Sequence, residues 1–167
     1  MLKLDDRDIR ILALLSREAR LSKAELARRI NLSPTPCWER LKRLEAAGII
    51  RAYRAEVSLR GLAPHVSVFV TVELERHHAE SFARFERAVA AREEVVGAWA
   101  LGGGFDYLLH VVTRDIESYQ ALIDGFLAAG LGLARYYTYV VTKPVKQAGP
   151  PLALLLGAED PPAGPGK

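Results

Sequence analysis

The feature that most constrains the fold is a pair of short helical segments joined by a tight turn near the N-terminus. Ser22 and Glu25 have the spacing of a capping box, which opens the first of these helices. A turn at Asn31 follows, and the second helix opens with Ser33 as N-cap and Pro34 at the first helical position. A short helix, a tight turn and a second helix with a small polar start are typical of a helix-turn-helix.

The second of these helices is amphipathic and ends before Gly48, a residue that tolerates the left-handed conformation at a helix end. Its inward stripe at helical spacing consists of Cys37, Leu41 and Leu44. An earlier helix, capped by Asp5 or Asp6, has the apolar positions Ile9, Leu12, Ala13 and Leu15. Residues 1–60 are therefore predicted to form a three-helix DNA-binding domain with a linker strand.

The helix that follows Ser33 is expected to enter the major groove of double-stranded DNA. Glu39 can accept a hydrogen bond from a cytosine amine, and Trp38 can contact a thymine methyl group. The basic residues can reach phosphates or guanine edges. The alternative is a solvated three-helix bundle without a ligand. The expected DNA-binding residues are Ser33, Thr35, Pro36, Trp38, Glu39, Arg40, Lys42 and Arg43.

Charge is divided unevenly along the chain. Residues 1–60 contain 14 Lys and Arg against 8 Asp and Glu, whereas the rest of the chain is slightly acidic. A basic first third favours nucleic-acid binding, and chance clustering of surface charge is the alternative.

Several other classes of protein are disfavoured. The longest charge-free runs reach 12 residues, which is too short to span a bilayer. Asp5 and Asp6 stand where a signal peptide needs apolar residues, so the chain is expected to be cytoplasmic, with no membrane partner. The single Cys37 cannot form an intramolecular disulfide, and none of the 4 histidines has the spacing of a metal ligand. We therefore expect no metal, no cofactor and no catalytic residues.

Residues 49–57 alternate β-prone residues with charges and are expected to form an exposed strand, either a wing or a linker ribbon. Residues 61–147 then alternate strand, helix, strand, strand, helix, strand. The expected strands are 66–74, 95–101, 106–113 and 135–145, and the expected helices are 79–92 and 116–128. The candidate core positions of these helices are Phe82, Phe85, Ala88, Val89, Ile116, Tyr119, Ile123 and Phe126.

This βαββαβ order predicts a ferredoxin-like α+β domain, in which both helices cover one face of a four-stranded antiparallel sheet. The other face of the sheet has nothing in this chain to cover it. Packing against the same face of a second copy would cover it, which predicts a two-fold dimer.

The N-terminal residues resemble the Lrp/AsnC family of feast/famine transcriptional regulators, and most closely its leucine-responsive branch. The resemblance lies in the string LSPTPCWERLKRLE at residues 32–45, in Gly48, Ile49, Ile50 and Tyr53, and in LDDRDIRIL at residues 4–12. The strings GGFDYLL at residues 103–109, TYVV at 138–141 and VKQ at 145–147 extend it to almost the whole chain.

The resemblance implies a sequence-specific regulator of amino-acid metabolism or transport, acting on pseudo-palindromic DNA sites. It also implies that residues 61–147 bind an amino-acid effector and form homo-oligomers. Relatives assemble as dimers that join into tetramers or octamers, with the effector between neighbouring subunits. Aliphatic residues near the implied site favour a branched-chain amino acid.

The candidate effector site centres on three consecutive glycines. Their backbone N–H groups can converge on a carboxylate, and Asp106 could bind the ammonium group of the same amino acid. A flexible hairpin connection with Asp106 as a turn residue is the alternative. Together with positions that the resemblance implies, the expected effector-binding residues are Ala100, Leu101, Gly102, Gly103, Gly104, Asp106, Ile116, Tyr139, Val140 and Val141.

One position departs from the leucine-responsive branch. Relatives there usually carry an acidic residue where this chain has Gly104, directly before Phe105 and Asp106. The loss of this charge puts a response to leucine itself in doubt.

Residues 148–167 are rich in Pro and Gly and are expected to form a mobile tail; docking of their leucines on a neighbour is the alternative. Two further functions compete with the regulator. Sirohaem decarboxylases share the two-domain architecture, but this chain keeps a basic recognition helix. A pure amino-acid-binding or assembly protein is the third possibility.

Overall fold

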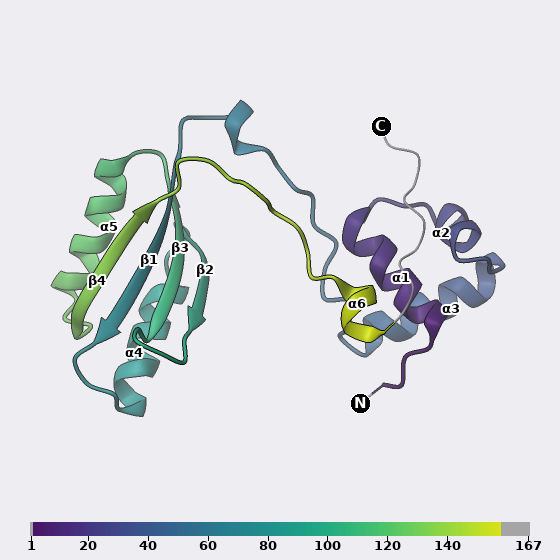
Figure 1. The fold of residues 1–167 in the computed structure, drawn as a ribbon, viewed down its shortest axis with the longest axis horizontal. Helices are drawn as coiled ribbons and strands as arrows, with labels where there is room; N and C mark the ends of the chain where they lie inside the picture. The colour runs from purple at the N-terminus through teal and green to yellow at the C-terminus, as the bar shows by residue number, and fades with distance from the viewer. Residues whose placement is uncertain (1, 158–167) are drawn as a thin grey trace. The chain divides into compact units, whose positions relative to one another are not determined.

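The computed structural model describes residues 2–157, and these form two compact units (Figure 1). One unit runs to Glu56 and also includes the chain from Lys146 onward. The other unit is Val57–Val145. The N-terminal unit is therefore assembled from two separate segments of the sequence.

The N-terminal unit begins with three helices, α1 (Asp6–Arg17), α2 (Lys23–Arg29) and α3 (Pro34–Ala46). The side chain of Asp5 caps α1 by accepting a hydrogen bond from the Asp8 N–H at 3.0 Å, and Asp8 accepts one from the Asp5 N–H at 3.1 Å. Ser22 caps α2 through the N–H of Glu25. The N-caps Asp5 and Ser22 are as predicted, but the predicted capping box of Ser22 and Glu25 is only half formed, because the Glu25 carboxylate binds Arg28 and Arg29.

The three helices enclose a single apolar core. The predicted stripe of α3 is buried, as are Ile9, Leu12 and Ala13 of α1, while Leu15 is half-buried. Ile11 and Leu14 are also buried, because helices pack against more than one side of α1. Gly48 follows α3 with a φ of 68°, in the left-handed region expected for it.

The strand predicted for residues 49–57 is absent. Residues 51–58 have no regular secondary structure, and a short 3-10 helix, η1 (Leu59–Gly61), follows them. A strand needs a neighbouring strand for its backbone hydrogen bonds, and the described residues offer none here. Tyr53 is instead anchored by a hydrogen bond that its hydroxyl donates to Glu45 at 2.8 Å.

The second unit has the predicted βαββαβ order. It comprises β1 (Val66–Leu74), α4 (Ala79–Ala90), β2 (Val95–Ala100), β3 (Tyr107–Thr113), α5 (Ile116–Ala128) and β4 (Leu133–Val140). The strands form an antiparallel sheet in the order β2-β3-β1-β4. Alternate residues of β1 and β3 are buried in one cluster with residues of both α4 and α5, so the two helices cover the same face.

The second-unit core follows the predicted helical stripes with one exception. Phe85 and Val89 of α4 and Tyr119, Ile123 and Phe126 of α5 are buried, and Phe82 and Ala88 are partly buried. Ile116, in the first turn of α5, is 51% exposed. Leu122, which the stripe omitted, is buried in its place.

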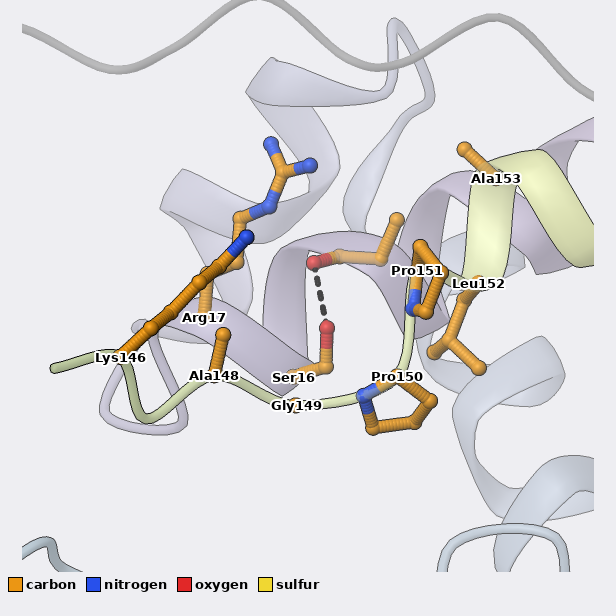
Figure 2. A pocket seen from close by; sticks show the side chains of 10 residues that line it. Ser16, Arg17, Lys146, Ala148, Gly149, Pro150, Pro151, Leu152 and Ala153 are labelled. Atoms are coloured by element: carbon orange, nitrogen blue, oxygen red, sulfur yellow. Dashed lines mark hydrogen bonds between the residues drawn. The ribbon is translucent and has the colours of Figure 1, made fainter.

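The chain after β4 returns to the N-terminal unit and forms a helix that was not predicted, α6 (Leu152–Leu156). Leu152 packs against the three-helix core, and Ala153 is buried, whereas Leu154 is 79% exposed. Figure 2 shows residues 146–153 passing along α1, where they enclose a pocket of about 500 Å³ with Ser16 and Arg17. The part of the expected tail beyond residue 157 lies outside the described residues.

Candidate DNA interface and effector site

Helix α3 presents a polar face that its buried stripe holds in place. Ser33, Thr35, Pro36, Glu39 and Lys42 are exposed, as the sequence predicts for a face that approaches DNA. Ser33 makes no side-chain capping bond, so its hydroxyl is available to a phosphate. The face therefore combines hydroxyl groups and a carboxylate in the first two turns of the helix, where base edges are usually read, with the cation of Lys42 in its second half.

Trp38 differs from its predicted role as an outward base contact. Its ring is half-buried and packs against the three-helix core. The ammonium group of Lys23, from α2, lies 3.3 Å from the ring centroid, and that of Lys42 lies 5.2 Å from it. A cation over an indole ring is held by the negative face of the ring. Trp38 therefore orients two lysines. Lys23 is not among the DNA-binding residues expected from the sequence, because it lies on another helix.

Arg40 and Arg43 are not simply free cations on this face. Arg40 donates to both carboxylate oxygens of Asp5, at 2.8 and 2.6 Å, and to Asp8 at 2.9 Å. Arg43 donates to the other oxygen of Asp8 at 2.5 Å. Their side chains remain 26% and 45% exposed. Both arginines thus combine contacts to α1 with partial access to solvent.

The hydrogen bonds of this cluster stabilise its charges. Burial acts to raise the pKa of Asp5, but hydrogen bonds from the Asp8 N–H and from Arg40 outweigh it and lower that pKa. The hydrogen bond to Asp5, followed by that to Asp8, raises the pKa of Arg40. On α2, hydrogen bonds from Arg28 and then Arg29 lower the pKa of Glu25 to about 2. The unit therefore carries its charges as ionised networks.

In the second unit, Asp106 anchors the start of β3 to the end of β1. Its Oδ2 accepts hydrogen bonds from the Leu74 N–H at 2.7 Å and lies 3.1 Å from Nε2 of His77. Its own N–H donates to the carbonyl of Val72 at 2.9 Å. Asp106 is thus part of the sheet framework, while its Oδ1 carries no such bond among the described residues.

The three glycines of the β2–β3 connection are exposed and have open space around them. A Cβ built on Gly102, Gly103 or Gly104 would meet no atom within 4 Å, and none of the three has a positive φ. Neither the backbone conformation nor crowding by other atoms of this chain therefore requires glycine at these three positions. They leave room for something that approaches the loop from outside the subunit.

The ten expected effector residues fall into two groups that lie apart on the sheet. Ala100, Leu101, Asp106 and the glycines lie where β2 joins β3, and Ala100 pairs with Tyr107, the first residue of β3. The second group is Ile116, Tyr139, Val140 and Val141: Tyr139 pairs with Phe69 near the middle of β1, Val140 pairs with Val68, and Ile116 follows the end of β3. Ala100 and Val140 lie four residues apart along the strands and three strand spacings apart across the sheet, which separates them by about 20 Å.

One apolar groove lies beside the first group. Its volume is about 250 Å³, and it lies between α4 and β2, where Phe85, Val89, Ala98, Ala100 and Tyr107 contribute to its walls. Tyr107 donates a hydrogen bond to Glu86 at 2.8 Å in the same wall. Of the expected effector residues, Ala100 is the one that lines it.

The face of the sheet away from the helices carries aromatic side chains. Phe69 and His110, on neighbouring strands, stack with ring centroids 4.6 Å apart, and His110 Nε2 lies 2.8 Å from the hydroxyl oxygen of Ser67. Tyr137 and Tyr139 of β4 are 46% and 54% exposed. We call this surface the open sheet face.

The chain matches two protein-family models that together span most of its length. Residues 4–51 match a winged helix-turn-helix DNA-binding model, and residues 67–151 match the Lrp/AsnC ligand binding domain. The transcriptional regulatory protein DoeX of Halomonas elongata is 49% identical over 146 residues, which cover 87% of this chain and 92% of that protein. The leucine-responsive regulatory protein of Escherichia coli K12 is 39% identical over 145 residues, which cover 87% and 88%.

A solved structure of a Neisseria meningitidis transcriptional regulator in complex with L-methionine is also similar. It superposes with a TM-score of 0.84 at 34% sequence identity, and covers 92% of this chain and 99% of that chain. These relatives are regulators, so the sirohaem decarboxylase alternative has no support among them.

Neither a membrane span nor a metal centre is found over residues 2–157. No helix there is long and apolar enough to cross a bilayer, and no group of His, Cys, Asp and Glu side chains could hold a metal ion. The helix-turn-helix and the sheet domain of the structure correspond to the two family models that match the sequence, and the solved relative has a similar fold. The chain belongs to the Lrp/AsnC family and is a DNA-binding transcriptional regulator with an amino-acid-binding domain.

Proposed function

We propose that this regulator binds an amino acid with an apolar, preferably branched, side chain at an interface between two subunits. The observation that carries the proposal is the separation of the expected effector residues into two groups about 20 Å apart. A free amino acid is too small to contact both groups of one chain. Two subunits that bring the glycine loop of one beside Tyr139–Val141 of the other would complete a single site.

The two groups supply complementary chemistry. The glycine loop offers backbone N–H groups to a carboxylate, and Oδ1 of Asp106 can accept a bond from the ammonium group. Ala100 and the neighbouring groove can receive an apolar side chain, and Ile116 and Val140 offer a second apolar wall. Leucine and methionine, which the names of two relatives contain, are both apolar and of medium size.

We further propose that the open sheet face forms a two-fold dimer. Exposed aromatic residues on an otherwise well-packed sheet are typical of a surface that another subunit covers. Such a dimer would present two helix-turn-helix units, so its DNA sites would be pseudo-palindromic with half-sites one or more helical turns apart. Further association of dimers would create the interfaces that the effector needs.

Subunit complementation tests the shared site in the full-length protein. Asp106→Asn keeps the acceptor for the Leu74 N–H and removes the charge that faces an ammonium group, whereas Ile116→Glu places a charge in the second group. Each variant alone should fail to bind branched-chain amino acids or methionine in calorimetry. A refolded 1:1 mixture should regain about one site in four, because random pairing joins an intact loop to an intact wall with that frequency.

Two results would overturn parts of this proposal. A mixture without any binding would show that the two groups do not complement each other across subunits, and it would overturn the shared site. Unchanged binding by both single variants would remove these residues from the effector site altogether. The dimer is tested separately by Tyr137→Glu on the open sheet face, with Leu127→Glu on α5 as the matched exposed control. Light scattering should show a smaller assembly for Tyr137→Glu alone.

A further inference from the structure

We infer that Asp8 of α1 is a positioning residue for the recognition helix, which sets the balance between sequence-specific and non-specific DNA binding. The carboxylate of Asp8 accepts hydrogen bonds from two arginines of α3, Arg40 and Arg43. It is therefore expected to orient the cations of the DNA interface, although it contacts no DNA itself.

Asp8 is fully buried, and both oxygens of its carboxylate accept hydrogen bonds. The residue has 0% exposure, and no other carboxylate in residues 2–157 is buried. Its Oδ1 accepts from Arg40 at 2.9 Å, and its Oδ2 accepts from Arg43 at 2.5 Å and from the Asp5 N–H at 3.1 Å. A buried carboxylate is tolerated only when it is paired and hydrogen-bonded. Asp8 thus depends on α3 for both of its charged partners.

The same contacts constrain α3. Arg40 and Arg43 are three residues apart, so they lie on one face of the helix, one turn from each other. Their joint contact with a single carboxylate favours rotations of α3 that turn this face toward Asp8. The core stripe of Cys37, Leu41 and Leu44 provides apolar packing, whereas Asp8 adds directional bonds to the adjoining face.

The charge of the cluster is balanced. Two guanidinium groups face the carboxylates of Asp5 and Asp8, whereas Lys23 and Lys42 have no carboxylate beside them among the interactions of the described residues. The acidic pair therefore reduces the attraction of the arginines for any phosphate backbone. Arg43, at 45% exposure, still has guanidinium N–H groups to direct at one defined position.

The test compares Asp8→Asn with Asp6→Asn in the full-length protein. Asp6 is exposed in the first turn of the same helix, so its variant has the same charge change without the arginine contacts. Binding is measured by fluorescence anisotropy, over a salt series, to a duplex selected from a random library by the wild type and to its scrambled version. The ratio of the two affinities reports sequence discrimination.

For Asp8→Asn we expect tighter binding to the scrambled duplex, a salt slope steeper by up to about 2, and a loss of discrimination of about tenfold. The steeper slope follows because two freed arginines each add nearly one phosphate contact. Asp6→Asn should shift both duplexes together and leave their ratio unchanged. A purely structural defect would weaken both duplexes and would not steepen the slope.

Asp5→Asn keeps the test decisive if Asp8→Asn does not fold. Asparagine is an equally good N-cap residue, so α1 should still begin normally. This variant removes the charge that faces Arg40 alone, and we expect a slope steeper by about 1 with a smaller loss of discrimination. If the folded variants of both Asp8 and Asp5 match Asp6→Asn in slope and ratio, the inference is wrong.

Discussion

The ammonium group of Lys23 lies 3.3 Å from the centre of the Trp38 ring and joins the start of α2 to the first turns of α3. Such a contact contributes about 0.5–1 kcal/mol where it is exposed to solvent. Its larger effect is geometric, because the aromatic ring holds a cation of one helix beside the polar face of the next. We therefore expect the DNA interface to extend beyond the recognition helix itself.

The two lysines on Trp38 should carry a large part of the salt-dependent DNA binding. We expect the double variant Lys23→Gln and Lys42→Gln to weaken binding to all duplexes and to flatten the salt slope by up to about 2. The double variant Lys143→Gln and Lys146→Gln is the control, because it makes the same charge change outside the helix-turn-helix. Anisotropy titrations that give equal slopes for the two double variants would contradict this assignment.

Glu39 should read a base rather than support the fold. It is exposed on α3, so Glu39→Ala should leave the melting temperature unchanged. We expect a loss of about 1–3 kcal/mol of discrimination at one base position, because a carboxylate accepts from the cytosine amine. Selection of binding sites from a random library would show the change. The same consensus for wild type and variant would argue against this role, and Glu56→Ala serves as the exposed acidic control.

The stability of the second unit should depend on Tyr107 at high pH. Burial, followed by the hydrogen bond to Glu86, raises the pKa of Tyr107 from 10.0 to about 12. The folded protein then keeps a proton that the unfolded chain releases, so this contribution is complete below pH 10 and is lost as the pH rises toward 12. Urea unfolding should show a shallower loss of stability over that range for Tyr107→Phe than for the exposed control Tyr137→Phe.

Helix α6 should stabilise the three-helix core from the far end of the chain. Leu152 packs against that core, whereas Leu154, two residues later, is 79% exposed. We expect Leu152→Ala to lower the stability of the N-terminal unit by about 1–2 kcal/mol, because a half-buried leucine loses part of its transfer free energy. Leu154→Ala should have almost no effect. Equal melting curves for the two variants would show that α6 adds nothing.

Periodicity predicted the elements that bury one regular face. The structure gives β1 and α5 the bounds that alternation and helical spacing predict, because their core residues repeat with the period of the element. The strand predicted at residues 49–57 does not form, because the described residues offer it no neighbouring strand. Alternation there describes local preference, and a strand also needs a partner that the pattern of one segment cannot supply.

The missed features of the candidate sites depend on contacts between distant residues. Arg40 and Arg43 look like free cations in the sequence, and Asp8 meets them from more than thirty residues away. Lys23 reaches Trp38 from another helix. Asp106 lies in the predicted loop, yet its bond to the Leu74 N–H depends on the pairing of β1 with β3. Each of these contacts exists only after the helices or strands have packed.

The return of the chain to its first unit also affects the order of synthesis. A ribosome releases the three helices early, but α6 emerges only after the whole of Val57–Val145, a delay on the order of ten seconds. During that interval the sheet domain can fold while the first unit waits for its last helix. A nascent chain would therefore hold an incomplete DNA-binding unit until α6 emerges and packs against the three helices.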